Sequence, residues 1–165
     1  MSIAQSMLAE FEQESKITRK FLERVPQDKL TWRPHEKSHT IGELAFHISI
    51  VPGNIARAAQ QDQSPLPPAS ELFKQPATVQ EILAAHDKGV DTVRQILPTL
   101  DDARLTTTTW TGTVNGKPVA TLPKALLLRL IMMNHWIQHR GQLGVYLRLL
   151  GAKVPASYGP SGDEG

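Results

Sequence analysis

The chain has 165 residues, of which 40% are hydrophobic and 21% are charged, and its formal net charge is +2 at pH 7. This composition predicts one soluble globular domain over residues 1–165, and the scattered basic residues lack the interleaved aromatics of a nucleic-acid-binding surface. The absence of cysteine excludes disulfides, thiolate metal ligands and a cysteine nucleophile, so any thiol chemistry needs a thiol supplied from outside.

Two kinds of targeting signal are missing from the sequence. No apolar run reaches the ~20 residues that a membrane-spanning helix needs. The N-terminal residues MSIAQSMLAEFEQESK lack the basic segment followed by an apolar one that a secretory signal requires. We therefore expect a cytoplasmic protein without a membrane partner.

The first helix is expected to begin at Ser2, which with Gln5 has the spacing of a capping box, and to end before Pro26. Its apolar face is interrupted by Ser15 and Thr18. These hydroxyls either bond to their own helical turn or lie near a polar site in the middle of the bundle.

The loop over residues 26–39 is rich in turn formers and charge. Trp32 is expected to close one end of the core. His35 and His39 lie among charged residues and are expected to be solvated, so neither is a ligand candidate.

A second helix is expected from the capping box of Thr40 and Glu43 to about Gln61. His47 lies on its apolar face. Pro52 lies inside this helix, where a proline cannot donate to the carbonyl of residue 48 and kinks the helix.

The connection over residues 62–77 contains four prolines, and its length favours a crossover in a helix bundle over a hairpin between antiparallel neighbours. The third helix is expected to begin at a third capping box, Thr78 with Glu81, and to end before Pro98. His86 lies at the centre of its inward face.

The chain changes character between residues 106 and 121, where threonines and valines flank Asn115 and Gly116, a pair typical of two-residue hairpins. A last helix follows and ends at Gly151. The irregular tail carries Tyr158, which is expected to dock on the bundle. Together these patterns predict an all-α fold: a four-helix bundle with a long connection between helices 2 and 3 and a small β-hairpin before helix 4.

The last helix carries the most informative pattern, LLLRLIMMNHWIQHRGQLGVYLRLL. Steps of three and four residues predict one inward stripe, made up of Leu128, Met132, His135, His139, Gln142, Tyr146 and Leu149. Buried imidazoles need partners. The spacing of His135 and His139 suits either a pair of metal ligands or two core histidines that each hydrogen-bond a neighbour.

His47 is the natural third ligand beside this pair. Three neutral imidazoles would leave the charge of a divalent metal uncompensated and a coordination position open for water or substrate. Zinc or nickel is the expected metal, because nitrogen ligands bind both more tightly than manganese or magnesium.

Two segments, LTWRPHEKSHTIGELAFHISIVPGNI and NHWIQHRGQLGVYLRLLGAKVPASYGPSGDE, resemble the signature regions of the DinB-like (damage-inducible, YfiT-related) family. The resemblance implies a four-helix bundle, commonly a dimer, with a divalent metal held by one histidine from the second helix and two from the fourth. That pattern falls on His47, His135 and His139. Characterised relatives include transferases and isomerases that use a low-molecular-weight thiol.

Two functions remain open. The first is an enzyme, possibly a metal-dependent thiol S-transferase, in which a metal-activated thiol or water attacks a small-molecule electrophile. The second is a stress-related binding module in which the metal is structural. No inward carboxylate is visible near the site, and this favours thiol activation over hydrolysis.

Several polar residues are candidates for the pocket around the metal, namely Asn54, His86 and Gln142. A homodimer is also expected, because the last helix offers more apolar surface than one core must bury. The residues expected on its outer or flanking positions are Leu127, Leu130, Ile137 and Leu147.

Overall fold

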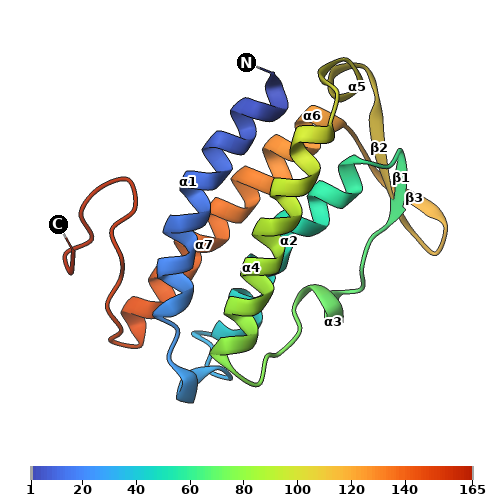
Figure 1. The fold of residues 1–165 in the computed structure, drawn as a ribbon. Helices are drawn as coiled ribbons and strands as arrows, with labels where there is room; N and C mark the ends of the chain where they lie inside the picture. Colours follow the sequence, from blue (N-terminus) through green and yellow to red (C-terminus); the bar gives the residue numbers. More distant parts are fainter. Residues whose placement is uncertain (1, 165) are drawn as a thin grey trace.

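Four long helices form the bundle in a computed structural model that describes residues 2–164 (Figure 1). They are α1 (Ile3–Glu23), α2 (Ile41–Ala59), α4 (Val79–Ile96) and a last helix in three consecutive parts. These parts are α6 (Lys124–Leu127), a π-helical stretch (Leu128–His135) and α7 (Trp136–Leu149). Each long helix packs on two others, so that the order around the bundle is α1, α4, α2, last helix.

The helices begin where the capping signals predict. The Ser2 side chain accepts from the backbone N–H of Gln5, and the Thr40 side chain accepts from that of Glu43. In return, the side chains of Gln5 and Glu43 accept from the backbone N–H groups of Ser2 and Thr40, which completes both capping boxes. Thr78 caps α4 by accepting from the backbone N–H of Glu81, but the Glu81 side chain accepts from Ala77 and not from Thr78, so the predicted third capping box is incomplete. These local bonds satisfy backbone donors that the first helical turn leaves free.

The connection between α2 and α4 is a crossover, as predicted. The two helices run in the same direction side by side, and residues 60–78 return along the length of the bundle to join them (Figure 1). This segment contains a short strand, β1 (Gln63–Pro65), and a single helical turn, α3 (Ala69–Leu72). Glycines allow the close approach, because a Cβ on Gly89 would lie 2.8 Å from the Ser49 carbonyl oxygen.

A small sheet covers one end of the bundle. Its strands β2 (Thr109–Val114) and β3 (Lys117–Pro123) form the predicted hairpin, and Asn115 and Gly116 both have positive φ, at 50° and 74°. β1 pairs in parallel with β2 and makes a third strand that was not predicted. Short helical segments complete the fold: η1 (Gln27–Lys29), η2 (Leu97–Thr99) and α5 (Asp102–Thr107).

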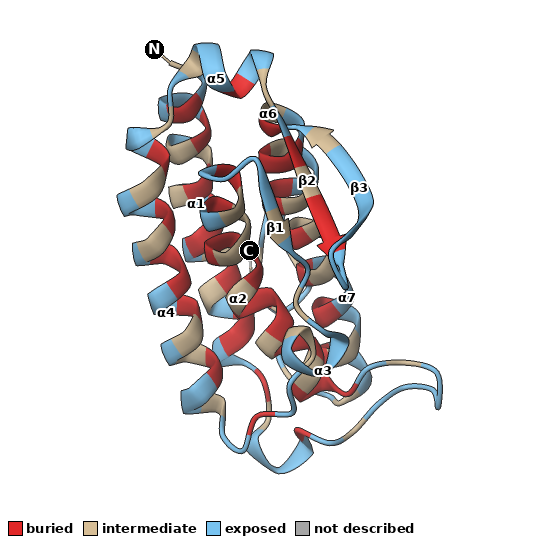
Figure 2. Ribbon diagram, turned by 90° about the vertical axis from the view of Figure 1, so that its right-hand side faces the viewer, coloured by how far each residue is buried: buried red, intermediate tan, exposed pale blue. Residues whose placement is uncertain are grey.

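The core lies between the facing sides of the four long helices, and β2 is more buried than β3 (Figure 2). At its centre the rings of Phe11 and Trp136 stack with their centroids 5.2 Å apart, and both side chains are fully buried. Burial of such aromatic pairs is a large contribution to folding. Among the described residues, no helix is long and apolar enough to cross a membrane.

The inward face of the last helix differs from the predicted stripe. The buried residues of this face include Leu128, Met132, Met133, Trp136, Arg140, Leu143 and Leu147. His135 and His139 lie half-buried beside this face, whereas Gln142 and Leu149 are exposed. The cause is the π-helical stretch, in which i→i+5 bonding shifts the phase of every residue that follows.

The predicted outer surface of the last helix is also partly wrong. Leu127 and Leu147, predicted on outer or flanking positions, are fully buried. Ile137 packs partly buried against the core, and Leu130 is exposed as predicted. The apolar residues that are exposed on the last helix are Leu126, Leu130, Val145 and Leu149.

The proline inside α2 leaves one carbonyl oxygen without its helical donor, and a tryptophan on the last helix donates to that oxygen. Pro52 has no N–H to donate to Ile48. The indole Nε1 of Trp136 donates to that carbonyl oxygen instead, at 2.9 Å, in the buried core. Because His47 precedes Ile48 and His135 precedes Trp136, this one bond holds two histidine-bearing segments together.

The C-terminal tail docks through Tyr158, as expected. Its hydroxyl donates to the Glu14 carboxylate at 2.9 Å and accepts from the Arg140 guanidinium at 2.9 Å. Arg140 also donates to Glu14 at 2.6 Å and to Thr18 at 3.2 Å. Arg140 and Glu14 are almost fully buried, so removing either would leave the other charge uncompensated.

The Trp136–Ile48 bond generates a prediction for stability. Trp136→Phe should lower the free energy of unfolding by about 1–3 kcal/mol beyond the packing loss, because the Ile48 carbonyl would stay buried without a donor. In a Pro52→Ala background the alanine N–H supplies that donor, so the same substitution should cost less. Chemical denaturation of the four proteins of this double-mutant cycle measures the difference. An equal cost in both backgrounds would contradict this account.

Candidate metal centre

Three histidines from two helices meet at the edge of the core. His47 comes from the middle of α2, His135 from the end of the π-helical stretch, and His139 from the first turn of α7. Nε2 of His135 lies 3.1 Å from Nε2 of His47 and 3.1 Å from Nε2 of His139. The ligand atoms of the three residues all lie within 4.8 Å of one another.

The other ring nitrogen of two of these histidines is held by a neighbour. Nδ1 of His47 lies 3.0 Å from the Leu72 carbonyl oxygen at the end of α3. Nδ1 of His139 lies 2.6 Å from Oε1 of Gln142. A carbonyl oxygen only accepts, so each Nδ1 carries the proton and each Nε2 presents a lone pair.

This arrangement fits a metal ion. A proton on Nε2 of His135 can satisfy the lone pair of His47 or of His139, but not both, whereas one cation at the centre satisfies all three nitrogens. With metal–nitrogen bonds of about 2.0–2.1 Å in tetrahedral geometry, neighbouring ligand nitrogens lie roughly 3.3 Å apart. The observed separations of 3.1 Å are close to this value.

Burial keeps all three rings neutral at physiological pH. Burial, the largest cause, and the nearby charge of His139 together lower the pKa of His47 to about 4, against the bond to Leu72. Burial also lowers the pKa of His135 and of His139. A neutral imidazole is the form that ligates a metal, so the site does not need to lose protons before it binds one.

The crossover covers His47 with an aromatic residue. The Phe73 ring stacks on the His47 ring with centroids 4.1 Å apart and an interplanar angle of 14°. His39 stacks on the Phe73 ring, at 3.6 Å and 2°. His39 is exposed, as expected, with 49% of its side chain accessible, and one face of its ring packs on Phe73. His35 is exposed, as expected.

Comparison with known proteins agrees with this geometry. The profile of the DinB family matches residues 1–165. The chain belongs to the DinB family. The uncharacterized protein YrdA of Bacillus subtilis (strain 168) is 27% identical over 161 residues, which are 95% of this chain and 89% of that protein.

Two crystal structures of DinB-like proteins share the fold. One, from Bacillus cereus ATCC 10987, superposes with a TM-score of 0.71 and 23% identity over 93% of this chain and 97% of the other. The second, YjoA from Bacillus subtilis, has a TM-score of 0.69 and 23% identity over the same shares of the two chains, 93% and 97%. They confirm the four-helix bundle and its small sheet as a DinB-like fold.

The three pocket candidates lie in different places. Gln142 contacts His139 and so lies beside the three-histidine cluster. Asn54 lies about two turns beyond His47 on α2, and its side-chain oxygen accepts from Arg57 at 3.2 Å. His86 lies on α4, and the structure does not bring it to the three-histidine cluster.

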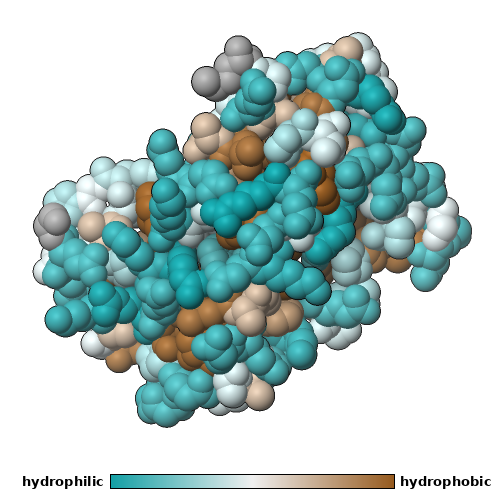
Figure 3. Space-filling model, in the orientation of Figure 1, coloured by the Kyte–Doolittle hydropathy of each residue, from teal (hydrophilic) through white to brown (hydrophobic). Residues whose placement is uncertain are grey.

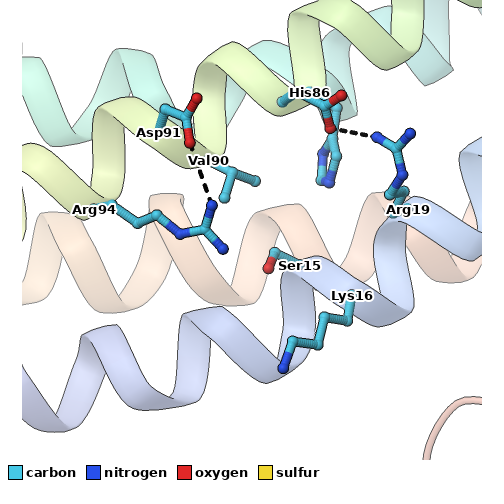
Figure 4. A pocket seen from close by; sticks show the side chains of 8 residues that line it. Ser15, Lys16, Arg19, His86, Val90, Asp91 and Arg94 are labelled. Carbon is cyan, nitrogen blue, oxygen red and sulfur yellow. Dashed lines mark hydrogen bonds and ion pairs between the residues drawn. The ribbon is translucent and has the colours of Figure 1, made fainter.

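His86 lines a separate cavity between α1 and α4, with a volume of about 270 Å³ (Figure 4). Burial lowers the pKa of His86 to about 4, against the charge of Asp87. Ion pairs join the two helices on this face, Arg19 with Asp87 and Arg94 with Glu12. Polar side chains accordingly cover much of the surface there (Figure 3).

The predicted absence of an inward carboxylate needs correction. Glu14 on α1 is buried, but it pairs with Arg140 and Tyr158 rather than with the metal centre. Ser15 bonds back to the Glu12 carbonyl in its own helix, the first of the two alternatives for that residue. Thr18 belongs to the Arg140 network.

The contrast between Gln142 and Asn54 generates a prediction. Gln142→Leu should weaken zinc binding about 10–100-fold, because the leucine cannot hold the proton of His139 on Nδ1. Asn54→Leu is the matched control, and it should leave zinc affinity unchanged. Competition against a chromophoric chelator measures both affinities. Equal losses in the two variants would show that Gln142 does not orient His139.

Proposed function

We propose that this DinB protein binds one divalent metal ion, zinc or nickel, through His47, His135 and His139. We further propose that it is a metal-dependent enzyme that activates a low-molecular-weight thiol, or water, for transfer to a small electrophile. The observation that carries the proposal is the convergence of three Nε2 lone pairs, two of them oriented by Leu72 and Gln142.

The residues around the site determine which chemistry is available. Three neutral ligands leave the charge of the bound ion uncompensated, and such an ion lowers the pKa of a thiol or water molecule beside it. The chain has no cysteine, so a sulfur nucleophile must come from a separate small molecule. The chain's own contribution is to hold the three nitrogens and to keep them unprotonated.

The site meets solvent on one side. His47 is 4% exposed and lies behind Phe73, so the α2 side is closed. His135 and His139 are only half-buried, and Gln142 beside them is exposed. A small molecule can therefore approach from the α7 side, where the histidines meet solvent.

A second candidate function is a non-catalytic binding module in which the metal is structural. One observation favours it: the cluster joins α2 to the last helix, next to the bond between Trp136 and Ile48. A metal there would strengthen an existing contact between the two helices, since ions that bind only the folded state add to its stability.

Metal and thiol binding test the proposal. Protein purified without a nickel column should contain about one divalent metal per chain, and His135→Ala should abolish it. In cobalt-substituted protein, 2-mercaptoethanol should add a near-ultraviolet charge-transfer band, because sulfur binds at the open position. Metal without any response to thiol, together with no acceleration of thiol addition to a test electrophile, would favour the structural module. Absence of stoichiometric metal would contradict both functions.

We also propose that the protein forms a homodimer through the last helix. Its exposed apolar residues recur at steps of four at both ends of the helix, Leu126 with Leu130 and Val145 with Leu149. Val145 and Leu149 are 59% and 60% exposed. Contact with a second copy of the chain would remove both apolar pairs from solvent.

A matched pair of substitutions tests the dimer. Val145→Glu should produce monomers at micromolar concentration, because it places a charge in the apolar contact. Val119→Glu, at a residue that is 55% exposed on β3, should leave the dimer intact. Sedimentation velocity distinguishes these outcomes. A monomeric wild-type protein, or loss of the dimer with Val119→Glu alone, would contradict the assignment to the last helix.

A further inference from the structure

His86 is a buried polar side chain that has no part in the metal centre. It is only 2% exposed, and its ring extends from α4 toward α1 into the cavity between the two helices (Figure 4). Ser15 and Val90 also line this cavity, and both are buried. A buried imidazole needs hydrogen-bond partners, so each of its two ring nitrogens has to be accounted for.

The backbone of α1 accounts for one of the two nitrogens. Burial has the largest effect on the pKa of His86 and lowers it, whereas the Ser15 backbone raises it. A backbone group that favours the protonated ring is a carbonyl oxygen, which accepts from a ring N–H. Because the ring is neutral at physiological pH, the nitrogen that bonds to Ser15 carries the proton and the other nitrogen carries a lone pair.

The second nitrogen of His86 faces the cavity. No group within residues 2–164 donates a hydrogen bond to it, and the nearby Ser15 hydroxyl donates to the Glu12 carbonyl oxygen instead, at 3.0 Å. In the same part of the chain, every side-chain nitrogen or oxygen that is shielded from solvent has a hydrogen-bond partner. The lone pair of His86 is therefore accessible from the cavity, where a hydrogen-bond donor can reach it.

Ion pairs between α1 and α4 close the two ends of the cavity. Arg19 on α1 pairs with Asp87 on α4 at one end. At the other end Arg94 on α4 binds both carboxylate oxygens of Glu12 on α1, at 2.6 Å and 2.8 Å. These pairs hold the two helices at a fixed separation, so the space between them has a defined length and width.

Lys16 lies on α1 between the two ends and lines the cavity (Figure 4). Its ammonium forms no ion pair with any carboxylate that the structure describes. The acids that line the cavity with it have other partners: Asp87 pairs with Arg19, and Asp91 pairs with Arg94 at 3.2 Å. Lys16 can therefore attract an anion without first losing a carboxylate partner.

We propose that this cavity binds a small hydroxy acid, whose carboxylate pairs with Lys16 and whose hydroxyl donates to the free ring nitrogen of His86. The lone pair requires a donor, which a carboxylate lacks, and the ammonium requires an anion, so one ligand has to carry both groups. The cavity volume of about 270 Å³ is that of roughly nine water molecules at about 30 Å³ each, which leaves room for a short carbon chain. The site is independent of the metal centre and of the proposed thiol chemistry.

Glycolate and acetate test the proposal, because they differ only in the hydroxyl group. In nuclear magnetic resonance titrations of the full-length protein, glycolate should shift the backbone amide signals of Ser15 and Val90. It should bind about 5-fold more tightly than acetate, the typical effect of one added hydrogen bond. His86→Phe keeps a ring of similar size but removes the acceptor, so it should bind the two acids equally. His35→Phe, at an exposed histidine, is the control and should keep the preference for glycolate.

A lysine substitution tests the charge separately from the hydroxyl. Lys16→Met should weaken the binding of glycolate and of acetate by about 2–5-fold each, the range of an exposed ion pair. Its preference for glycolate should remain, because His86 is unchanged. Lys20→Met removes the same charge from an exposed position on α1 that does not line the cavity, and it should leave both affinities as in wild type.

The location of the shifts distinguishes this site from the metal centre, since glycolate can also ligate a metal ion. In His135→Ala, which removes one of the three ligands, the shifts at Ser15 and Val90 should persist. Their loss in that variant, or their absence from wild type, would overturn the inference. Equal affinities of wild type for glycolate and acetate would do the same, and this comparison stands even if His86→Phe fails to fold. Equal effects of Lys16→Met and Lys20→Met would show that the carboxylate does not pair with Lys16.

Discussion

The hydrogen bond from Trp136 to the Ile48 carbonyl holds together the two helices that carry the three-histidine cluster. It exists because Pro52 cannot donate inside α2, and a buried carbonyl without a donor costs about 1–3 kcal/mol. The residues that precede its two partners are His47 and His135, so the bond fixes how closely these histidines approach. The carbonyl that Pro52 leaves free in α2 is therefore the point at which the last helix is aligned with α2.

The crossover between α2 and α4 completes the site rather than simply joining two helices. Its single helical turn ends at Leu72, whose carbonyl holds the proton of His47 on Nδ1, and the next residue is the Phe73 that covers the His47 ring. Antiparallel neighbours would need only a short turn, and no segment would then pass the middle of α2. The parallel arrangement of α2 and α4 requires a long return, which brings a carbonyl and an aromatic ring to the ligand.

Local signals in the sequence were sufficient for the helices, the Asn115–Gly116 turn and the crossover, because caps, prolines and turn residues act over a few positions. Resemblance to the DinB-like family, together with the spacing of His135 and His139, identified the three-histidine cluster. The burial pattern of the last helix was missed because a π-helical stretch changes the period, and no local residue pattern signals it. The stacking of His39 on Phe73 was also not predicted, because Phe73 lies 34 positions away along the chain in an irregular segment.

The groups around the three-histidine cluster would leave the charge of a bound ion uncompensated. The three ligands are neutral, and the groups that orient two of them, the Leu72 carbonyl and the Gln142 amide, are neutral as well. The buried carboxylate of Glu14 is committed to Arg140, so it cannot offset the charge of an ion at the site. A cation held in this way would keep its full attraction for an incoming anion.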